Sequence, residues 1–228
     1  MVRLIFFLSI GILANAYDKC KVTEESCMVK LANDVFTEIL SGNDELDPMR
    51  HEIIEGNLSG LKYSLTDTSV TGFKNCRVDV AKGDFVKLSF DVTLLCPAFL
   101  MRGNYSANGQ IITLPVEGSG NYTIQTKKYR LGIKMDVEMQ PKDGKSYLHV
   151  KSFSVDPEPL EQVVFKFDNL FNGNKELAEP DLKFANENWM QVTSALQSPV
   201  FQADLNKIIK EANKHLKKGA LEEYFILE

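Results

Sequence analysis

Apolar and polar residues alternate through the middle of the chain, which predicts β-strands that bury one face and expose the other. The clearest run, from Tyr129 to Met139, is followed by Asp143-Gly144, a strong signal for a two-residue hairpin loop. That loop predicts four cross-strand pairs: Met139 with Leu148, Val137 with Val150, Glu138 with His149, and Asp136 with Lys151. The last two pairs are electrostatically favourable, so we expect His149 to face solvent as the partner of a carboxylate.

Shorter stretches of the same pattern predict further strands. Their alternating apolar residues are Leu61, Tyr63 and Leu65; Val86, Leu88, Phe90, Val92 and Leu94; and Val163, Phe165 and Phe167. Lys82-Gly83 is a candidate turn before the second group, and it would place Cys76 opposite Ser89. Because the longest strands exceed the usual length and have one dry face, we expect the sheet to curl.

Two segments repeat with helical spacing instead. The first helix is expected from about Thr23 to Ser41 and places Met28, Leu31, Val35 and Ile39 on one side. The second segment runs from Trp189 to Leu216, and its apolar stripe changes sides partway. One side carries Trp189, Val192, Leu196, Val200 and Ala203, and the other carries Phe201, Leu205, Ile208, Ile209, Ala212 and Leu216. Either this helix kinks at Pro199 or other structure encloses it, so it is central; two surface helices separated at Ser198-Pro199 are the alternative.

The beginning of the chain has the pattern of a secretory signal peptide. Residues 1–16 carry Arg3, an apolar run from Leu4 to Leu13, and the sequence Ala14-Asn15-Ala16. We expect cleavage after Ala16 and a single domain over residues 17–228, secreted and extracellular. No later segment approaches the roughly 18 apolar residues of a membrane helix, so stable membrane insertion is not expected. Removing Arg3 changes the net charge from −5 to −6, which disfavours nucleic acid or an anionic membrane as a partner.

All four cysteines lie after the predicted cleavage point, and an even number in an oxidising compartment favours disulfides. Cys20 and Cys27 can close a short loop at the start of the first helix, which leaves Cys76 and Cys96 as the second pair. The turn at Lys82-Gly83 would put that second pair out of register. A zinc site is the weaker alternative, with His51, His149 and His215 as the histidines available to it.

Three sequons, at Asn57, Asn104 and Asn121, are candidate glycosylation sites in a secreted chain. Motifs of hydrolases, zinc proteases and nucleotide-binding enzymes do not occur. Paired carboxylates brought together from distant segments stay open as an enzyme site. We expect a protein that is not an enzyme and needs neither a metal nor a cofactor.

An ordered set of short motifs spans nearly the whole chain after residue 16. These are Cys20 and Cys27, Leu46-Asp47-Pro48, Val70-Thr71-Gly72-Phe73, Gly103-Asn104-Tyr105, Gly118-Ser119-Gly120-Asn121-Tyr122, Asn169-Leu170-Phe171-Asn172-Gly173 and Asn188-Trp189. By this set the chain resembles the insect takeout and juvenile hormone-binding protein family. The resemblance implies an α+β fold in which a highly curved antiparallel sheet wraps a long C-terminal helix, with an N-terminal helix, around an elongated hydrophobic tunnel. The first cysteine pair matches the family, and the second does not obviously match a family disulfide.

The same resemblance implies a monomeric, non-enzymatic carrier of a small lipophilic ligand, such as a juvenile-hormone-like terpenoid, a fatty acid or a chemosensory molecule. We expect the dry strand faces and the helix to line the tunnel: Leu88, Phe90, Val92, Leu131, Ile133, Met135, Val137, Phe165, Phe167, Trp189 and Phe201. Tyr63, Tyr105 and Tyr122 are candidates for the few polar contacts that select the ligand. The first helix is a candidate lid.

Three other functions compete with this one. A protein of the same fold that binds bacterial lipid or a membrane surface would be expected to concentrate basic residues at one tip, and no such loop cluster occurs. A secreted interaction protein would fill the tunnel with its own side chains. An enzyme would turn over a bound ester or epoxide.

Overall fold

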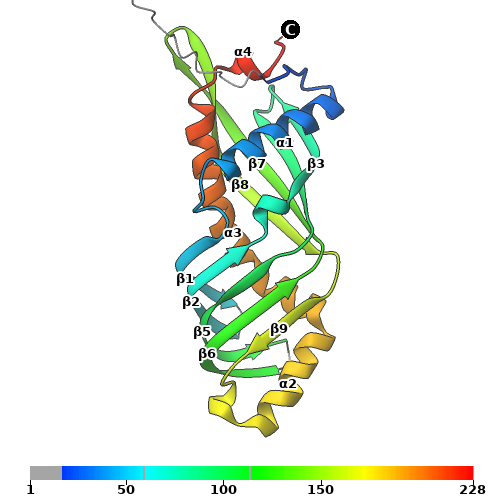
Figure 1. Ribbon diagram of the computed structural model, residues 1–228, viewed down its shortest axis with the longest axis vertical. Coiled ribbons are helices and arrows are strands. Elements are labelled where there is room, and N and C mark those ends of the chain that lie inside the picture. The colour runs from blue at the N-terminus through cyan, green and yellow to red at the C-terminus, as the bar shows by residue number, and fades with distance from the viewer. Residues whose placement is uncertain (1–16, 59, 113, 228) are drawn as a thin grey trace, which may run out of the picture.

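The computed structural model describes residues 17–58, 60–112 and 114–227, so the predicted signal peptide lies outside the described residues. The molecule is elongated, with one helix following its long axis (Figure 1). The helices are α1 (Glu25–Ser41), α2 (Lys175–Glu187), α3 (Trp189–Leu216) and α4 (Leu221–Tyr224), with 3₁₀ turns η1 (Phe73–Asn75) and η2 (Phe171–Gly173). Helices α1 and α4 lie at one end of the long axis and α2 lies at the other (Figure 1).

Nine strands, each paired antiparallel with its neighbours, form two sheets within the described ranges. One sheet has the order β1-β2-β5-β6-β9, formed by Met49–Leu58, Leu61–Thr71, Leu100–Ile111, Leu114–Thr126 and Val163–Phe167. The other has the order β3-β4-β7-β8, formed by Arg77–Asp84, Ser89–Cys96, Tyr129–Lys142 and Lys145–Pro159. The strands curl around α3 without closing into a barrel, as the predicted fold class requires (Figure 1).

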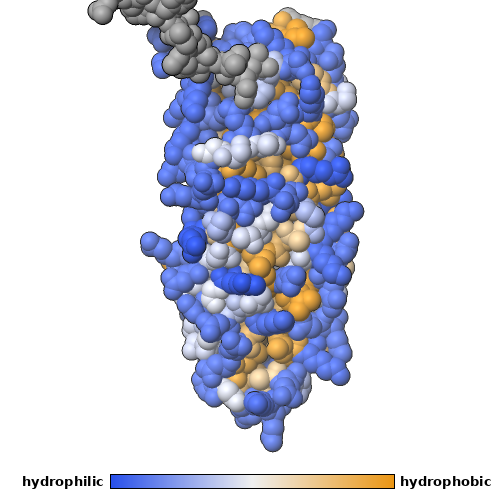
Figure 2. Space-filling model, viewed as in Figure 1, coloured by the Kyte–Doolittle hydropathy of each residue, from blue (hydrophilic) through white to orange (hydrophobic). Residues whose placement is uncertain are grey.

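Two regions are distinguished below. The α1 end comprises the four-stranded sheet, α1, α4 and the second half of α3, and the α2 end comprises the five-stranded sheet, α2 and the first half of α3. Figure 2 shows that apolar residues reach the viewed face only in broken patches between polar side chains. No helix within the described ranges combines the length and apolar character needed to cross a bilayer.

Helix α3 runs without interruption through Pro199, so the alternative of two separate surface helices is wrong. Its change of apolar side follows from its neighbours. Val192 and Val200 face the α2 end, whereas Leu205 and Ile208 are buried in the second half of the helix, which packs against β8 and β1. Other structure therefore encloses the helix, and both of its apolar sides are used.

The hairpin of β7 and β8 confirms most of the predicted register. Asp143 and Gly144 form its loop with positive φ angles of 52° and 76°, as a primed turn requires. Of the four predicted pairs, the three nearer the loop are confirmed: Met139 with Leu148, Glu138 with His149, and Val137 with Val150. The pair of Asp136 with Lys151 is wrong, because a bulge shifts the register and places Asp136 opposite Ser152.

The prediction that His149 faces solvent as the partner of a carboxylate is only partly correct. His149 is only half-exposed, its Nδ1 is buried, and the side chain borders a groove between β8 and α3. No hydrogen bond joins it to Glu138 in the part of the chain that the structure describes; that carboxylate instead accepts one from Gln140 Nε2 at 2.8 Å. The two residues are opposite each other in the register, but the histidine side chain borders the groove that α3 also lines.

The hairpin of β3 and β4 corrects the predicted turn at Lys82-Gly83. The chain turns after Asp84, whose Oδ1 accepts hydrogen bonds from the backbone N–H groups of Val86 and Lys87, both at 2.9 Å. Val86 is consequently exposed in the turn, and Leu88 leaves it with a φ of 53°, so neither belongs to the strand. The longer strand β3 brings its start level with the end of β4.

This register forms the second disulfide. Arg77 pairs with Leu95, which places Cys76 beside Cys96, and the two are bonded with Cα atoms 4.1 Å apart. Cys20 and Cys27 form the first disulfide. Both predicted pairs are therefore present, and the zinc alternative is wrong.

Candidate functional site: an apolar cavity at the α2 end

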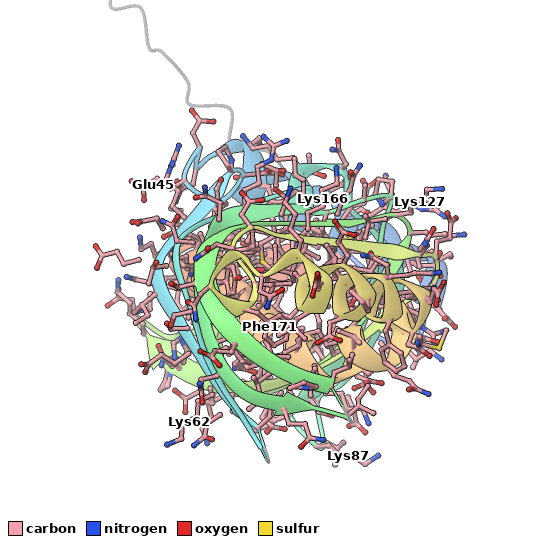
Figure 3. All side chains as sticks on the ribbon, turned by 90° about the horizontal axis from the view of Figure 1, so that it is seen from below. Glu45, Lys62, Lys87, Lys127, Lys166 and Phe171 are labelled. Atoms are coloured by element: carbon pink, nitrogen blue, oxygen red, sulfur yellow. A yellow bond between two sulfur atoms is a disulfide. The ribbon has the colours of Figure 1, made fainter. Side chains whose placement is uncertain are left out.

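An apolar cavity of about 150 Å³ lies between the five-stranded sheet, α2 and the first half of α3. Its wall is almost entirely carbon and comes from β2, β5, β6 and β9 on one side and from both helices on the other. Figure 3 looks along the molecule from this end and shows Phe171 inside the curve of the strands, whereas Lys62, Lys127 and Lys166 lie around the outside. A cavity of this size and chemistry excludes ordered water and accepts apolar molecules.

Glycines in β6 let the strands curl tightly enough to form this wall. A Cβ atom at Gly120 would lie 2.5 Å from the carbonyl oxygen of Asp168, and one at Gly118 would lie 2.8 Å from that of Asn169. Gly118 also has a φ of 144°, which other residues rarely adopt. Both sites therefore require glycine, and the segment after β9 can cross β6 closely.

Three aromatic side chains close the cavity toward the α1 end. The rings of Phe99 and Phe201 are 5.5 Å apart, those of Tyr129 and Phe201 are 5.1 Å apart, and Phe99 and Tyr129 are 5.9 Å apart. All three residues line the cavity. This aromatic cluster, defined as Phe99, Tyr129 and Phe201, separates the cavity from the packed core beyond it.

Five of the residues predicted to face the ligand line this cavity. They are Tyr63, Tyr105, Phe165, Phe167 and Phe201. The curl of the sheet brings side chains of β5 and β9 together across β6: Tyr105 and Phe167 meet edge to face with ring centres 4.9 Å apart. Tyr63, Phe165 and Phe167 alternate along β2 and β9 and Phe201 belongs to a helical stripe, which is why periodicity could find these four.

The other nine predicted lining residues lie outside the lining of this cavity. They are Leu88, Phe90, Val92, Leu131, Ile133, Met135, Val137, Trp189 and Tyr122. Most belong to β4 and β7 of the four-stranded sheet, where their dry faces pack as core; Leu131 is fully buried and Phe90 contacts Phe225. Alternation identified dry faces in both sheets, but it could not tell a packed face from one that borders a cavity.

The tyrosine hydroxyls bond to the protein itself. Tyr63 donates to the carbonyl oxygen of Leu196 at 3.0 Å, Tyr105 donates to that of Asp168 at 2.8 Å, and the hydroxyls of Tyr122 and Thr68 are 2.8 Å apart. Burial raises the pKa of each of the three tyrosines to about 12, so they remain neutral at physiological pH. In this structure Tyr63 and Tyr105 use their hydroxyl protons to hold the wall together, and neither offers an unused proton to a ligand.

Residues that the sequence did not single out complete the wall. Met101, Ala107 and Ile111 alternate with polar residues on β5, and Leu182 and Ala185 contribute from α2. The alternation on β5 was available as a signal, but its glycines and asparagines weaken the pattern. Helix α2 has no buried residue, so its contribution depends on tertiary placement.

Two polar side chains on α3, Thr193 and Asp204, also line the cavity although both are buried. Asp204 Oδ1 lies 2.7 Å from Nε2 of His51 on β1. Burial raises the pKa of the Asp204 carboxyl, and the hydrogen bond from His51 opposes that increase. Sequence reasoning missed this pair because its two residues are 153 positions apart.

Helix α1 is not part of the cavity wall. It packs against β3 and the second half of α3, and none of its residues lines the cavity. The helix that borders the cavity is α2, so the predicted lid does not fit α1. Within residues 17–58, 60–112 and 114–227, no cluster of three or more His, Cys, Asp or Glu side chains is arranged to hold a metal ion.

The three sequon asparagines, Asn57, Asn104 and Asn121, are exposed. Asn104 and Asn121 are cross-strand partners on β5 and β6, on the outer face of the sheet. Glycosylation at these sites stays a prediction.

Comparisons with known proteins agree with this architecture. The profile of the family described as haemolymph juvenile hormone binding protein matches residues 4–226. The circadian clock-controlled protein daywake of Drosophila yakuba is 26% identical over 202 residues, which cover 81% of this chain and 77% of that protein. Daywake of Drosophila melanogaster matches with the same identity and coverage.

Among solved structures, Takeout 1 of Epiphyas postvittana superposes with a TM-score of 0.83 and is 27% identical. The match covers 92% of this chain and 99% of that structure. The curled sheet, the N-terminal helix and the long C-terminal helix are thus shared with it. The chain belongs to the haemolymph juvenile hormone binding protein family.

Proposed function

We propose that this protein is a secreted, non-catalytic carrier that binds one small lipophilic molecule in the cavity at the α2 end. The observation that carries the proposal is the cavity itself, whose wall is apolar and whose few hydroxyls mostly bond within the protein. Membership of a family described as binding juvenile hormone supports a lipophilic ligand of terpenoid or fatty-acyl type. The two disulfides are consistent with an oxidising extracellular compartment such as haemolymph.

Desolvation supplies the binding free energy in this proposal. Burying about 400 Å² of apolar ligand surface at about 25 cal/mol per Å² gives a gross gain of roughly 10 kcal/mol. Immobilising the ligand takes back several kcal/mol, which leaves roughly micromolar affinity or somewhat better. A carrier that must also release its ligand is well served by affinity in this range. We expect it to act as a monomer.

Native mass spectrometry of the protein secreted from insect cells tests the proposal. We expect a copurifying lipophilic molecule, released and identified after denaturation. The variant Ala107→Trp fills the cavity from β5 and is expected to abolish that adduct. Its matched control is Asn108→Trp, which adds the same side chain at the exposed neighbouring position and should retain the adduct.

Each other result points to one of the competing functions. A wild-type protein that is repeatedly empty, and that binds no added terpenoid or fatty acyl probe, would contradict the carrier role. Binding to anionic vesicles that Ala107→Trp does not weaken would indicate a membrane-surface protein. N-terminal sequencing of the secreted chain tests the predicted start at Tyr17.

A further inference from the structure

Asp204 is a carboxyl group buried beside the proposed ligand site. The residue is 0% exposed and is among the residues of α3 that line the cavity. Its Oδ1 contacts His51 Nε2 at 2.7 Å, whereas its Oδ2 has no hydrogen-bond partner among the described residues. Buried carboxylate oxygens are nearly always hydrogen-bonded, because leaving one unpaired forfeits its hydration without compensation.

The polar groups around Asp204 already have other partners. The hydroxyls of Thr68 and Tyr122 bond to each other, and the ammonium of Lys207 donates to the backbone carbonyl of Arg50. Tyr122 lies near enough for the Asp204 charge to contribute to the raised pKa of its hydroxyl. None of these groups is hydrogen-bonded to Oδ2 in the structure.

Most of the remaining polar groups of the wall have partners, but the half-buried carboxylate of Asp181 on α2 and the hydroxyl of Thr193 have none among the described residues. Tyr129 donates to Gln197 Oε1, and Gln197 Nε2 donates to the carbonyl oxygen of Pro157 at 2.7 Å. Among the described lining residues, Thr193 Oγ1 and Asp204 Oδ2 are the two fully buried side-chain atoms that have no hydrogen-bond partner. Thr193 lies roughly 16 Å away along the helix axis, by the rise of an α-helix, so the two atoms mark separate points.

With a single proton held between Oδ1 and His51 Nε2, Oδ2 is a hydrogen-bond acceptor, whereas a further proton on Oδ2 would make it a donor. When the proton of the contact is on Nε2, the carboxylate is ionised and Oδ2 carries free lone pairs. When that proton is on Oδ1, Oδ2 is the carbonyl-like oxygen and again accepts. A threonine hydroxyl both donates and accepts, so Thr193 does not discriminate between ligands in this way.

We propose that Asp204 Oδ2 accepts a hydrogen bond from a hydroxyl group of the ligand, so that the cavity selects a lipophilic alcohol. This inference rests on the proposed carrier function and names the ligand class. An ether or ester of the same chain length has no donor and leaves Oδ2 unpaired. An ionised fatty acid has no donor either, and its charge is repelled by the carboxylate.

The test compares three probes of matched chain length: 1-tetradecanol, 1-methoxytetradecane and tetradecanoate. Competition against a bound fluorescent fatty acyl probe gives their relative affinities at pH 7.5. We expect the alcohol to bind wild-type protein roughly tenfold more tightly than the ether, the effect of one additional hydrogen bond, and tetradecanoate to bind no better than the ether.

Asp204→Asn converts the acceptor into a donor of nearly the same shape. If Oδ1 of the asparagine keeps the contact with His51, its Nδ2 faces the position of Oδ2 and donates to either an alcohol or an ether. We expect the tenfold difference in affinity between the alcohol and the ether to fall below about twofold, because the variant has no acceptor that only the alcohol can use. Asp136→Asn removes an exposed carboxylate on β7 and should keep the full difference.

The outcomes separate this inference from the carrier function. If the alcohol and the ether bind wild-type protein equally, or tetradecanoate binds most tightly, the Asp204 proposal is overturned while the carrier function stands. If none of the probes binds, the carrier function itself fails. A thermal melt shows whether Asp204→Asn folds. If it does not fold, the ratio of the affinities of wild-type protein for the alcohol and the ether still tests the proposal.

Discussion

The two ends of the molecule use the same alternating strand pattern for different purposes. At the α1 end, the dry faces of β4 and β7 belong to the core, where Leu94 and Leu131 are almost inaccessible and Phe90, Val92 and Met135 are partly buried. At the α2 end, the dry faces of β2, β5, β6 and β9 surround a cavity of about 150 Å³. The aromatic cluster of Phe99, Tyr129 and Phe201 lies where the two arrangements meet. Apolar alternation thus specifies burial, and the strand curvature specifies whether the buried space is filled.

The two ends also differ in their disulfide bonds. Cys20–Cys27 joins the chain before α1 to the first turn of that helix, and Cys76–Cys96 joins the start of β3 to the end of β4. Both disulfides therefore belong to the packed end. The α2 end is held by backbone pairing and by tyrosine hydroxyls such as that of Tyr105. A more constrained end and a less constrained end suit the proposed carrier role, in which a ligand enters and leaves at one place.

The largest effect expected from this comparison is on core packing. Leu131→Ala at the α1 end should lower the free energy of unfolding by about 2–5 kcal/mol, because it opens a void in a close-packed region. Leu65→Ala, a leucine in a strand that lines the cavity, should cost only about 1–2 kcal/mol, because part of its surroundings is already empty. Urea unfolding measures both values, and equal losses would argue against the distinction between the two ends.

Removing the second disulfide should have the next largest effect. The double substitution Cys76→Ser and Cys96→Ser releases a loop with a separation of 20 residues and should cost about 3 kcal/mol. The corresponding change at Cys20 and Cys27, separated by 7 residues, should cost less. Thermal and urea unfolding under non-reducing conditions provide the comparison. A larger loss from the shorter loop would mean that the N-terminal anchor contributes more than chain entropy.

A glycine substitution tests the curvature of the α2 end. Gly120→Ala places a methyl group against the carbonyl oxygen of Asp168 and should cost about 1–3 kcal/mol, with weaker ligand binding as the strands separate. Gly132→Ala on β7 is the control, since its nearest contact would be an ordinary 3.6 Å and the change should be neutral or slightly stabilising. If both variants behave alike, close approach at β6 does not shape the cavity.

A small pH effect is expected at the α1 end. His215 lies 3.1 Å from the Tyr17 hydroxyl and 3.6 Å from Glu38, beside Tyr224 and near Lys218. Burial lowers the pKa of His215, with Glu38 opposing, so the folded state binds fewer protons than the unfolded state. The free energy of unfolding should therefore fall slightly as the pH decreases below the ordinary histidine value of 6.5, and His215→Gln should reduce that slope. An unchanged slope in the variant would exclude this residue as the cause.

Local rules predicted much of the fold. The helical stripe of α1, the Asp143-Gly144 hairpin and the alternation of β2, β7 and β9 each depend on neighbouring residues, and the structure confirms them. The turn between β3 and β4 was missed because Asp84 makes it with a side-chain hydrogen bond and no glycine. The bulge opposite Asp136 was missed because the register was extended from the loop alone, although the apolar positions of β8 change phase between Val150 and Phe153.

The site was less predictable than the fold. Phe165 and Phe167 line the cavity and Phe90 and Ile133 do not, yet all four are apolar residues with the same alternating signal. The difference depends on which strands curl away from α3, and this involves contacts between distant segments such as Gly120 and Asp168. The His51–Asp204 contact likewise links β1 to α3. Such properties become visible only in three dimensions.

A crystal structure with a terminally brominated C14 alcohol tests the central claim most directly, because anomalous scattering locates the bromine independently of the protein model. We predict one bromine site inside the curve of β2, β5, β6 and β9, with the alcohol oxygen within hydrogen-bond distance of Asp204. Bromine found instead within the four-stranded sheet, or only on the outer surface, would contradict the account.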